Sequence, residues 1–310
     1  HVEKNGKTSF LKAYDIMKFS SVSVPGSTMM DVMNDMTTAY KYECELSDYC
    51  RNKHVTKVAF VLDSGEISIS GHSFPVVPYL IFDMADGDVR KHLSATETMD
   101  YAWRFRSLHD LAVGLKQLHQ VEVSHQDLKP SNILVFSKES KIGDLGRSMC
   151  RGVDGPYNRL HFSGDRTYAP PEILYRYYER DWTKRVCATD CYLLGSMVVF
   201  YFAGISMTAL LRTHMHDGFG WDEWTGEYDE IVPYLDDSFS HALDEFEQNI
   251  MKREYSEKLR SAVEQLCTPY PEQRGHPCNI SASGSNYSME RYVSLFDYLR
   301  KKAEHQLKSI

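Results

Sequence analysis

The feature that most limits the fold of this 310-residue chain is an uncharged stretch beyond its middle. Residues 192–211 read YLLGSMVVFYFAGISMTALL, twenty residues without a charge, which is long enough to span a lipid bilayer. The stretch also holds two Gly, three Ser or Thr and two Tyr, and its flanks lack the Lys and Arg cluster of a membrane anchor. We therefore expect a helix buried on all sides in a large domain, and no membrane partner.

Charge and cysteine content exclude further classes of protein. The chain has 35 Lys and Arg against 43 Asp and Glu, and a net charge of -8 argues against nucleic acid as a partner. Its seven cysteines are an odd number without paired CxxC spacing. We therefore expect free thiols and a cytoplasmic location, rather than a disulfide framework or a zinc ribbon.

The pattern of apolar residues changes near residues 83–88. Four short runs rich in β-branched and aromatic residues come first, at 1–4, 9–15, 58–62 and 76–82. A loop is predicted over 20–27 and a helix over 30–51. Beyond the joint, helical patterns dominate, among them 101–120 and 289–308, with a short hairpin between 133 and 142. The chain thus predicts an α+β fold with a small β-rich lobe (1–83) and a larger, mainly helical lobe (84–310).

The polar residues that could carry chemistry are densest between 124 and 146. SHQDLKPSNILV occupies 124–135 and KIGDLG occupies 141–146, so Asp144 follows Asn132 by twelve positions. Phosphoryl transfer needs a carboxylate that orients a hydroxyl and accepts its proton, a cation near the moving group, and oxygen ligands for Mg²⁺. Asp127 can be the base, Lys129 the cation, and Asn132 with Asp144 the metal ligands.

These two motifs resemble those of the protein kinase family. The HxDLKPxN loop matches at every specified position, and Asp-Leu-Gly at 144–146 stands for the family's metal-binding Asp-Phe-Gly. The resemblance implies a two-lobed kinase fold that uses ATP and Mg²⁺ to phosphorylate protein substrates, with itself as one candidate. Lys129, two residues after Asp127, is the pattern of the family's Ser/Thr branch.

The resemblance also implies a phosphate-binding lysine in the small lobe. Lys12 resembles the strand lysine that contacts nucleotide phosphates, and a carboxylate on the following helix should pair with it. Glu43 and Glu45 both remain candidates, although Glu43 lies on the more convincing apolar stripe. Phe10 stands where the family usually has a small residue, and its alternation with Lys12 predicts that it faces the nucleotide cleft.

Residues 79–85, YLIFDMA, resemble the strand and hinge that hold adenine. The resemblance implies that the backbone at Asp83 and Ala85 contacts the base and that Phe82 closes the back of the pocket. It also implies that Asp88, or Asp86, meets the ribose. The family's Gly-rich phosphate loop is not visible, and we expect it to precede residue 1.

Two structural features of the large lobe follow from the same resemblance. Glu172, in YAPPE at 168–172, resembles the end of the activation segment and should form a buried ion pair with Arg274. Asp190 resembles the aspartate that opens the buried central helix and holds the catalytic loop.

Two departures bear on regulation and substrates. Gln126 replaces the Arg that receives a phosphorylated activation loop in many kinases, so we expect weak dependence on phosphorylation there. Residues 213–251 contain eleven Asp or Glu and no Lys or Arg. The negative electrostatic potential of such a segment favours basic substrates. A solvated acidic face or a partner-binding insert explains the segment at least as well.

The sequence favours a serine/threonine protein kinase over two rivals. One is a pseudokinase that binds nucleotide without turnover. This alternative stays open because the Gly-rich loop is not visible and because Phe10 stands where the family usually has a small residue. The other is a small-molecule phosphotransferase of the kinase-like superfamily. Such enzymes usually lack counterparts of Lys129 and of the Glu172–Arg274 pair, both of which this sequence has.

Overall fold

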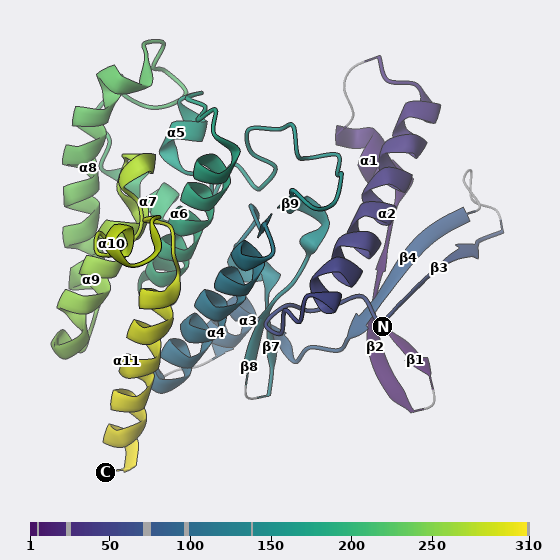
Figure 1. Ribbon diagram of the computed structural model, residues 1–310, viewed down its shortest axis with the longest axis horizontal. Helices are drawn as coiled ribbons and strands as arrows, with labels where there is room; N and C mark the ends of the chain where they lie inside the picture. The colour runs from purple at the N-terminus through teal and green to yellow at the C-terminus, as the bar shows by residue number, and fades with distance from the viewer. Residues whose placement is uncertain (5, 23–25, 71–75, 96–98, 138, 309–310) are drawn as a thin grey trace.

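The computed structural model describes residues 1–4, 6–22, 26–70, 76–95, 99–137 and 139–308. A sheet with two helices forms one end of the molecule and a large helical body forms the other (Figure 1). The N-terminus lies beside the sheet, and the C-terminus lies at the end of the last helix. The predicted α+β fold of two lobes is confirmed.

The small lobe is an antiparallel sheet with the order β1-β2-β4-β3. Its strands are β1 (Val2–Lys4), β2 (Lys7–Ala13), β3 (Asp63–Ser68) and β4 (Val76–Asp83). Residue 5, in the predicted hairpin turn, lies outside the described residues. Lys12 pairs in register with Leu80, and Phe10 pairs with Phe82. The pairing of β2 with β4 therefore fixes where Lys12 and Phe10 lie along the sheet.

Helix α2 (Met29–Asn52) is the long helix of the small lobe. The Thr28 side chain accepts the Asp31 N–H while the Asp31 carboxylate accepts the Thr28 N–H, and this capping box fixes where the helix begins. Its buried residues recur at three- and four-residue intervals and include Met36, Glu43 and Leu46. Glu43 is thereby carried on the inward face.

Two predictions for the small lobe are wrong. The predicted loop over 20–27 overlaps a short helix, α1 (Ile16–Val22), which packs on α2; residues 23–25 lie outside the described part. The predicted strand at 58–62 is not one, because Val58 makes only an isolated bridge to Ile142 and β3 starts at Asp63. Val58 and Val61 are buried, so their apolar character reflects packing rather than sheet pairing.

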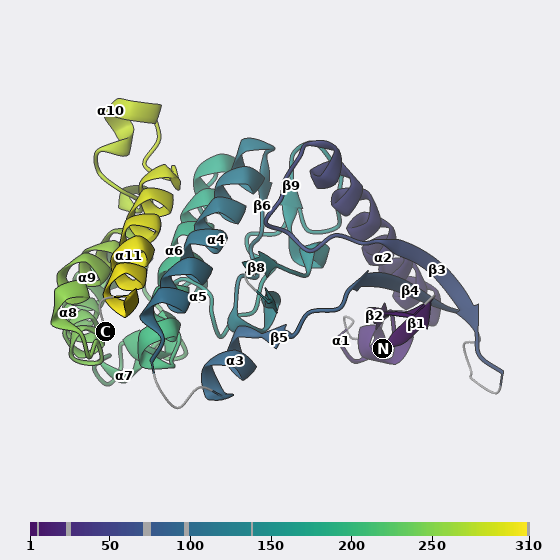
Figure 2. The same ribbon diagram turned by 90° about the horizontal axis from the view of Figure 1, so that it is seen from below.

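The large lobe is mostly helical (Figure 2). Its longer helices are α4 (Tyr101–Gln120), α6 (Trp182–Ala203), α8 (Tyr228–Gln248), α9 (Arg253–Cys267) and α11 (Glu290–Lys308). The shorter helices are α3 (Val89–Ala95), α5 (Pro171–Leu174), α7 (Met207–Thr213) and α10 (Asn279–Ser283). Short strands lie at its border with the small lobe: β5 (Gly87–Asp88), β6 (Val123–Ser124), β7 (Ile133–Phe136), β8 (Glu139–Ile142) and β9 (Met149–Cys150). Three 3₁₀ turns complete it: η1 (Pro130–Asn132), η2 (Leu145–Arg147) and η3 (Pro271–Gln273).

The uncharged stretch at 192–211 forms two core helices rather than one. Helix α6 has the length and composition of a membrane span, but 83% of its most apolar window is buried inside the protein. It ends at Gly204, whose φ of 74° lies in the left-handed region that favours glycine. Ser206 then caps α7 by accepting the Ala209 N–H. The predicted burial is confirmed, and the predicted single helix is wrong.

Candidate active site

A cleft of about 410 Å³ lies between the two lobes. Most of the predicted nucleotide and metal residues line it: Lys12, Glu43, Phe82, Asp83, Ala85, Asp88, Asn132 and Asp144. Phe10 also lines the cleft, with its ring centroid 6.4 Å from that of Phe82, as its alternation with Lys12 suggested. Glu45 does not, because it is exposed on the other face of α2.

Lys12 links the two lobes. Its Nζ lies 2.6 Å from Glu43 Oε2 and 2.8 Å from Asp144 Oδ1. The open choice between Glu43 and Glu45 is therefore decided for Glu43, and Glu45 is not the partner. Burial raises the pKa of Glu43 although Lys12 opposes the rise. Burial lowers the pKa of Lys12, but the charges of Glu43 and Asp144 outweigh it and raise that pKa, so Lys12 stays charged.

Asp144 sits at a strained turn between β8 and η2. Its backbone has φ 58° and ψ 72°, a left-handed conformation that an Asp tolerates better than most residues. Burial alone would raise its pKa, but Lys12 holds it below the usual range, so the carboxylate is ionised. Its Oδ1 also accepts the Gly146 N–H at 3.3 Å. An ionised carboxylate thus faces the cleft beside Lys12.

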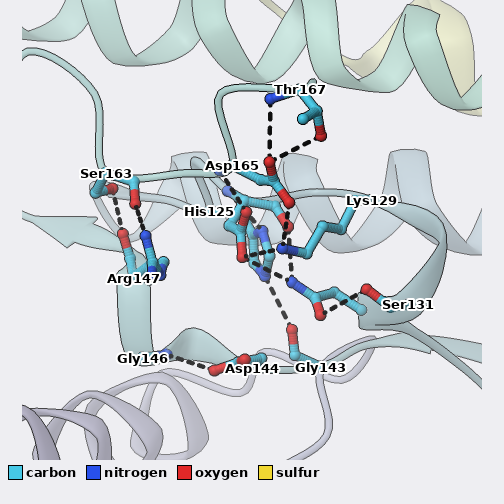
Figure 3. A network of polar contacts seen from close by, with 12 residues as sticks. His125, Lys129, Ser131, Gly143, Asp144, Gly146, Arg147, Ser163, Asp165 and Thr167 are labelled. Atoms are coloured by element: carbon cyan, nitrogen blue, oxygen red, sulfur yellow. Dashed lines mark hydrogen bonds and ion pairs between the residues drawn. The ribbon is translucent and has the colours of Figure 1, made fainter. Parts of the chain in front are cut away.

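Asp127, in the catalytic loop, is held by three groups. Its Oδ1 accepts the Asp165 N–H at 2.8 Å, and its Oδ2 accepts from Asn132 Nδ2 at 3.0 Å. Lys129 Nζ lies 3.3 Å from the same Oδ2 and 3.1 Å from Asp165 Oδ2. Figure 3 shows Lys129 and Asp165 pointing toward each other, with Asp165 also bonded to Thr167. The pKa of Asp165 is lowered, because bonds from Thr167 and Lys129 outweigh burial.

Asp165 is the residue that the sequence did not suggest. It comes from the activation segment, 38 positions after Asp127, and no short motif joins the two. Its one sequence signal is that it lies just before the Ala-Pro-Pro-Glu run at 169–172.

The catalytic loop is anchored to the helical core by Asp190. This fully buried carboxylate accepts four hydrogen bonds, from Ser124 Oγ, His119 Nε2 and the backbone N–H groups of His125 and Gln126, at 2.8–3.0 Å. Burial lowers the pKa of His119, but the neighbouring Cys187 and Asp190 outweigh it and raise that pKa to about 10. Asp190 lies inside α6 rather than opening it, because the helix starts eight residues earlier, at Trp182.

The activation segment ends at a buried ion pair. Arg274 Nη1 and Nη2 each lie 2.6 Å from one oxygen of Glu172, and the guanidinium is fully buried. Arg274 also donates from Nε to the Thr268 carbonyl oxygen and stacks over Tyr192. The pair that the resemblance implied is present, in a bidentate geometry.

Gln126 is fully buried beneath the activation segment. Its Nε2 donates to Ser124 Oγ and the Val186 carbonyl oxygen, and its Oε1 has no hydrogen-bond partner among the described residues. The position that could offer a charge to a loop phosphate therefore offers an uncharged amide.

The geometry agrees with the comparison to known families. A sequence model of the protein kinase domain matches residues 29–282. The chain belongs to the protein kinase family. Its match begins at α2, so β2 and Lys12 lie outside the matched range. The structure nevertheless places Lys12 in the lining of the cleft, in contact with Glu43 and Asp144.

Known kinases resemble parts of this kinase domain. Rat serine/threonine-protein kinase DCLK1 is 36% identical over 108 residues, which cover 32% of this chain and 24% of DCLK1. The Aurora/IPL1-related protein kinase 2 of Caenorhabditis briggsae is 30% identical, over 41% of this chain and 39% of its own length. Mouse "Inactive serine/threonine-protein kinase PLK5" is 27% identical over 64% of this chain and 32% of its own length. The chain thus spans a quarter to two fifths of these relatives.

Proposed function

We propose that this kinase transfers the γ-phosphoryl group of ATP to Ser or Thr hydroxyls of proteins. The observation that carries the proposal is the contact of Asp127 with Lys129 and Asn132 in one loop. Asn132 also lines the cleft, together with Asp144 and Lys12. Lys129 and the names of the serine/threonine kinases among the relatives support the choice of acceptor.

The donor set fits Mg²⁺. Asn132 uses its Nδ2 to bond Asp127, which leaves its amide oxygen as a ligand, and the Asp144 carboxylate is ionised. Mg²⁺ prefers such hard oxygen donors and takes few of them from protein. Among the described residues, no cluster of three His, Cys, Asp or Glu side chains forms a separate metal site. ATP bound with Mg²⁺ would supply the phosphoryl group and neutralise its developing charge.

The chain's own residues would then position the acceptor. Asp127, held by Asn132 and by the Asp165 N–H, would orient the hydroxyl and accept its proton. Lys129 would stabilise negative charge near the transferred group, at a position fixed between Asp127 and Asp165. Lys12, fixed by Glu43, would hold the nucleotide phosphates.

Partners and location remain proposals. Helix α8 carries much of the acidic segment, and exposed Asp222, Asp229 and Asp236 would favour basic protein substrates. Other acids there already have partners, since Asp244 pairs with Arg260 and Glu245 with His214. All seven cysteines are free, which supports a reducing compartment such as the cytoplasm. Autophosphorylation is a further candidate reaction.

The rival function is nucleotide binding without turnover. The similarity to a kinase named inactive favours it. Both carboxylate oxygens of Asp127 are already bonded in this structure, and an acceptor hydroxyl would have to compete with the Asp165 N–H.

A phosphorylation assay with radiolabelled ATP and Mg²⁺ distinguishes phosphoryl transfer from nucleotide binding without turnover. Wild type, Asp127→Asn and Asp144→Asn would be incubated with a basic protein substrate, and Asp63→Asn, at an exposed aspartate of β3 outside the acidic segment, would serve as the control. We expect label on Ser or Thr that both active-site variants lose by at least ~100-fold and the control keeps. ATP binding without label would support the rival, and label on small molecules alone would refute both.

A further inference from the structure

Tyr14 forms an additional contact with the Lys12–Glu43 pair. It follows β2 by one residue, is buried, and donates its phenol O–H to Glu43 Oε2, the same oxygen that binds Lys12 Nζ. The other oxygen, Glu43 Oε1, is buried and has no hydrogen-bond partner among the described residues. The two donors, Lys12 and Tyr14, therefore meet at one oxygen of this buried carboxylate.

Lys12 is not a dedicated partner of Glu43. Its Nζ is shared with Asp144, and the proposed phosphoryl transfer would require it to bind nucleotide phosphates as well. A buried carboxylate whose single donor is shared with other anions is poorly compensated, because the charge of that donor is divided among them. A second donor that serves Glu43 alone removes this difficulty.

Tyr14 is rigidly placed for that task. Its backbone N–H donates to the Pro78 carbonyl oxygen, and its ring stacks on Phe19 of α1 and meets Tyr40 of α2 edge-on. Burial and the charge of Glu43 raise the pKa of Tyr14, so the phenol remains a donor. The Lys12 ammonium also lies 5.5 Å from the centre of the Tyr14 ring.

We propose that Tyr14 is a positioning residue, which holds Glu43 in place so that Lys12, still paired with Glu43, can also bind the phosphates of bound nucleotide. The proposal rests on the proposed function. Helix α1, which lies against α2 in Figure 1, supports Tyr14 through Phe19. Tyr14 acts through Glu43 and Lys12 and does not itself line the cleft.

The test compares two ligands whose difference is the phosphate chain. Dissociation constants of ATP with Mg²⁺ and of adenosine would be measured by calorimetry for wild type, Tyr14→Phe and Tyr40→Phe. Tyr14→Phe keeps the ring and removes only the donor, and Tyr40→Phe removes a neighbouring phenol that does not contact Glu43. We expect Tyr14→Phe to weaken ATP binding about five- to tenfold and adenosine binding less than twofold, with Tyr40→Phe near wild type.

A double-variant cycle checks that Tyr14 acts through Glu43. In a Glu43→Gln background, Tyr14→Phe should cause little further loss of ATP affinity. Equal weakening of ATP and adenosine, unchanged ATP binding, or additive losses with Glu43→Gln would overturn the proposal. A wild type that binds ATP but transfers no phosphoryl group would refute only the proposed function. A wild type that binds no ATP would refute both.

Discussion

Asp190→Asn is the perturbation whose effect can be worked most directly from the structure. The Asp190 carboxylate is the shared acceptor for four donors, and two of them are backbone N–H groups of the catalytic loop, at His125 and Gln126. Asparagine has the same shape, but one of the two terminal atoms of its amide is a nitrogen, whose NH2 group donates hydrogen bonds and cannot accept them. The substitution therefore tests the acceptor function of Asp190 with almost no change in packing.

The expected cost follows from the bonds that are lost. Oδ2 accepts three of the four bonds and Oδ1 accepts one, so an asparagine leaves at least one donor facing its amide nitrogen, and the rest lose a charged acceptor. A buried hydrogen bond to a charged group contributes about 1.5–3 kcal/mol. Loss of about two such bonds gives ~3–6 kcal/mol, or a fall in melting temperature of roughly 5–9 °C for a domain of this size.

The pH dependence gives a second, independent readout. The pKa of His119 is raised from 6.5 to about 10 in the fold. The stability from charged His119 is therefore fully present below about pH 6.5 and is lost as pH rises through about 10, with an upper bound of ~5 kcal/mol. Because Asp190 supplies part of that shift, Asp190→Asn should lose less stability than wild type between pH 6.5 and 10.

Urea unfolding at several pH values would measure both effects, with phosphoryl transfer followed in parallel. Asp237→Asn is the matched control, because Asp237 also faces histidines but is 57% exposed, and it should change stability by less than ~1 kcal/mol. A cost below ~1 kcal/mol for Asp190→Asn, or a pH dependence identical to that of wild type, would refute this account of the catalytic-loop anchor.

Three further perturbations probe the activation segment. Glu172→Gln should cost ~3–5 kcal/mol in thermal unfolding, since it leaves the fully buried Arg274 guanidinium uncompensated, and a cost near zero would show that the pair is hydrated. Gly164→Ala should abolish phosphoryl transfer, because its Cβ would lie 2.0 Å from the Gln126 carbonyl oxygen; normal activity would mean that the segment shifts freely. Phosphatase treatment of the protein should leave phosphoryl transfer within about twofold of the untreated level, and a collapse of activity would contradict the role given to Gln126.

The parts of the fold that the sequence predicted well are those set by local pattern. Helix α4 was predicted at 101–120 and lies there, because Leu108, Leu111, Leu115 and Leu118 recur at helical spacing and all are buried. The catalytic-loop residues Asp127 and Asn132 lie five positions apart, so one short loop brings them into contact.

The parts that the sequence missed depend on contacts between distant segments. Nothing within 58–62 distinguishes a strand from an extended run that crosses between lobes, since a short apolar run such as this one, which buries Val58 and Val61, occurs in both. Glu43 and Glu45 are two residues apart on one helix, and only the placement of α2 against β2 and Asp144 decides which one meets Lys12. Asp165 reaches Asp127 through the path of the whole activation segment, which no spacing rule describes.

Uncharged contacts can explain how the activation segment is ordered without a phosphate. The Tyr42 phenol on α2 donates to the Ser148 carbonyl oxygen, and Asn158 bonds the backbone of Cys150 and Val153. Arg147, a cation within the segment, and Ser163 exchange two bonds through their carbonyl oxygens, so this guanidinium is already engaged. A phosphate that recruited Arg147 would have to displace these bonds, and it would gain correspondingly little. The neutral Gln126 beneath the segment is consistent with a catalytic loop whose geometry is set by Asp190 and Asp165 instead.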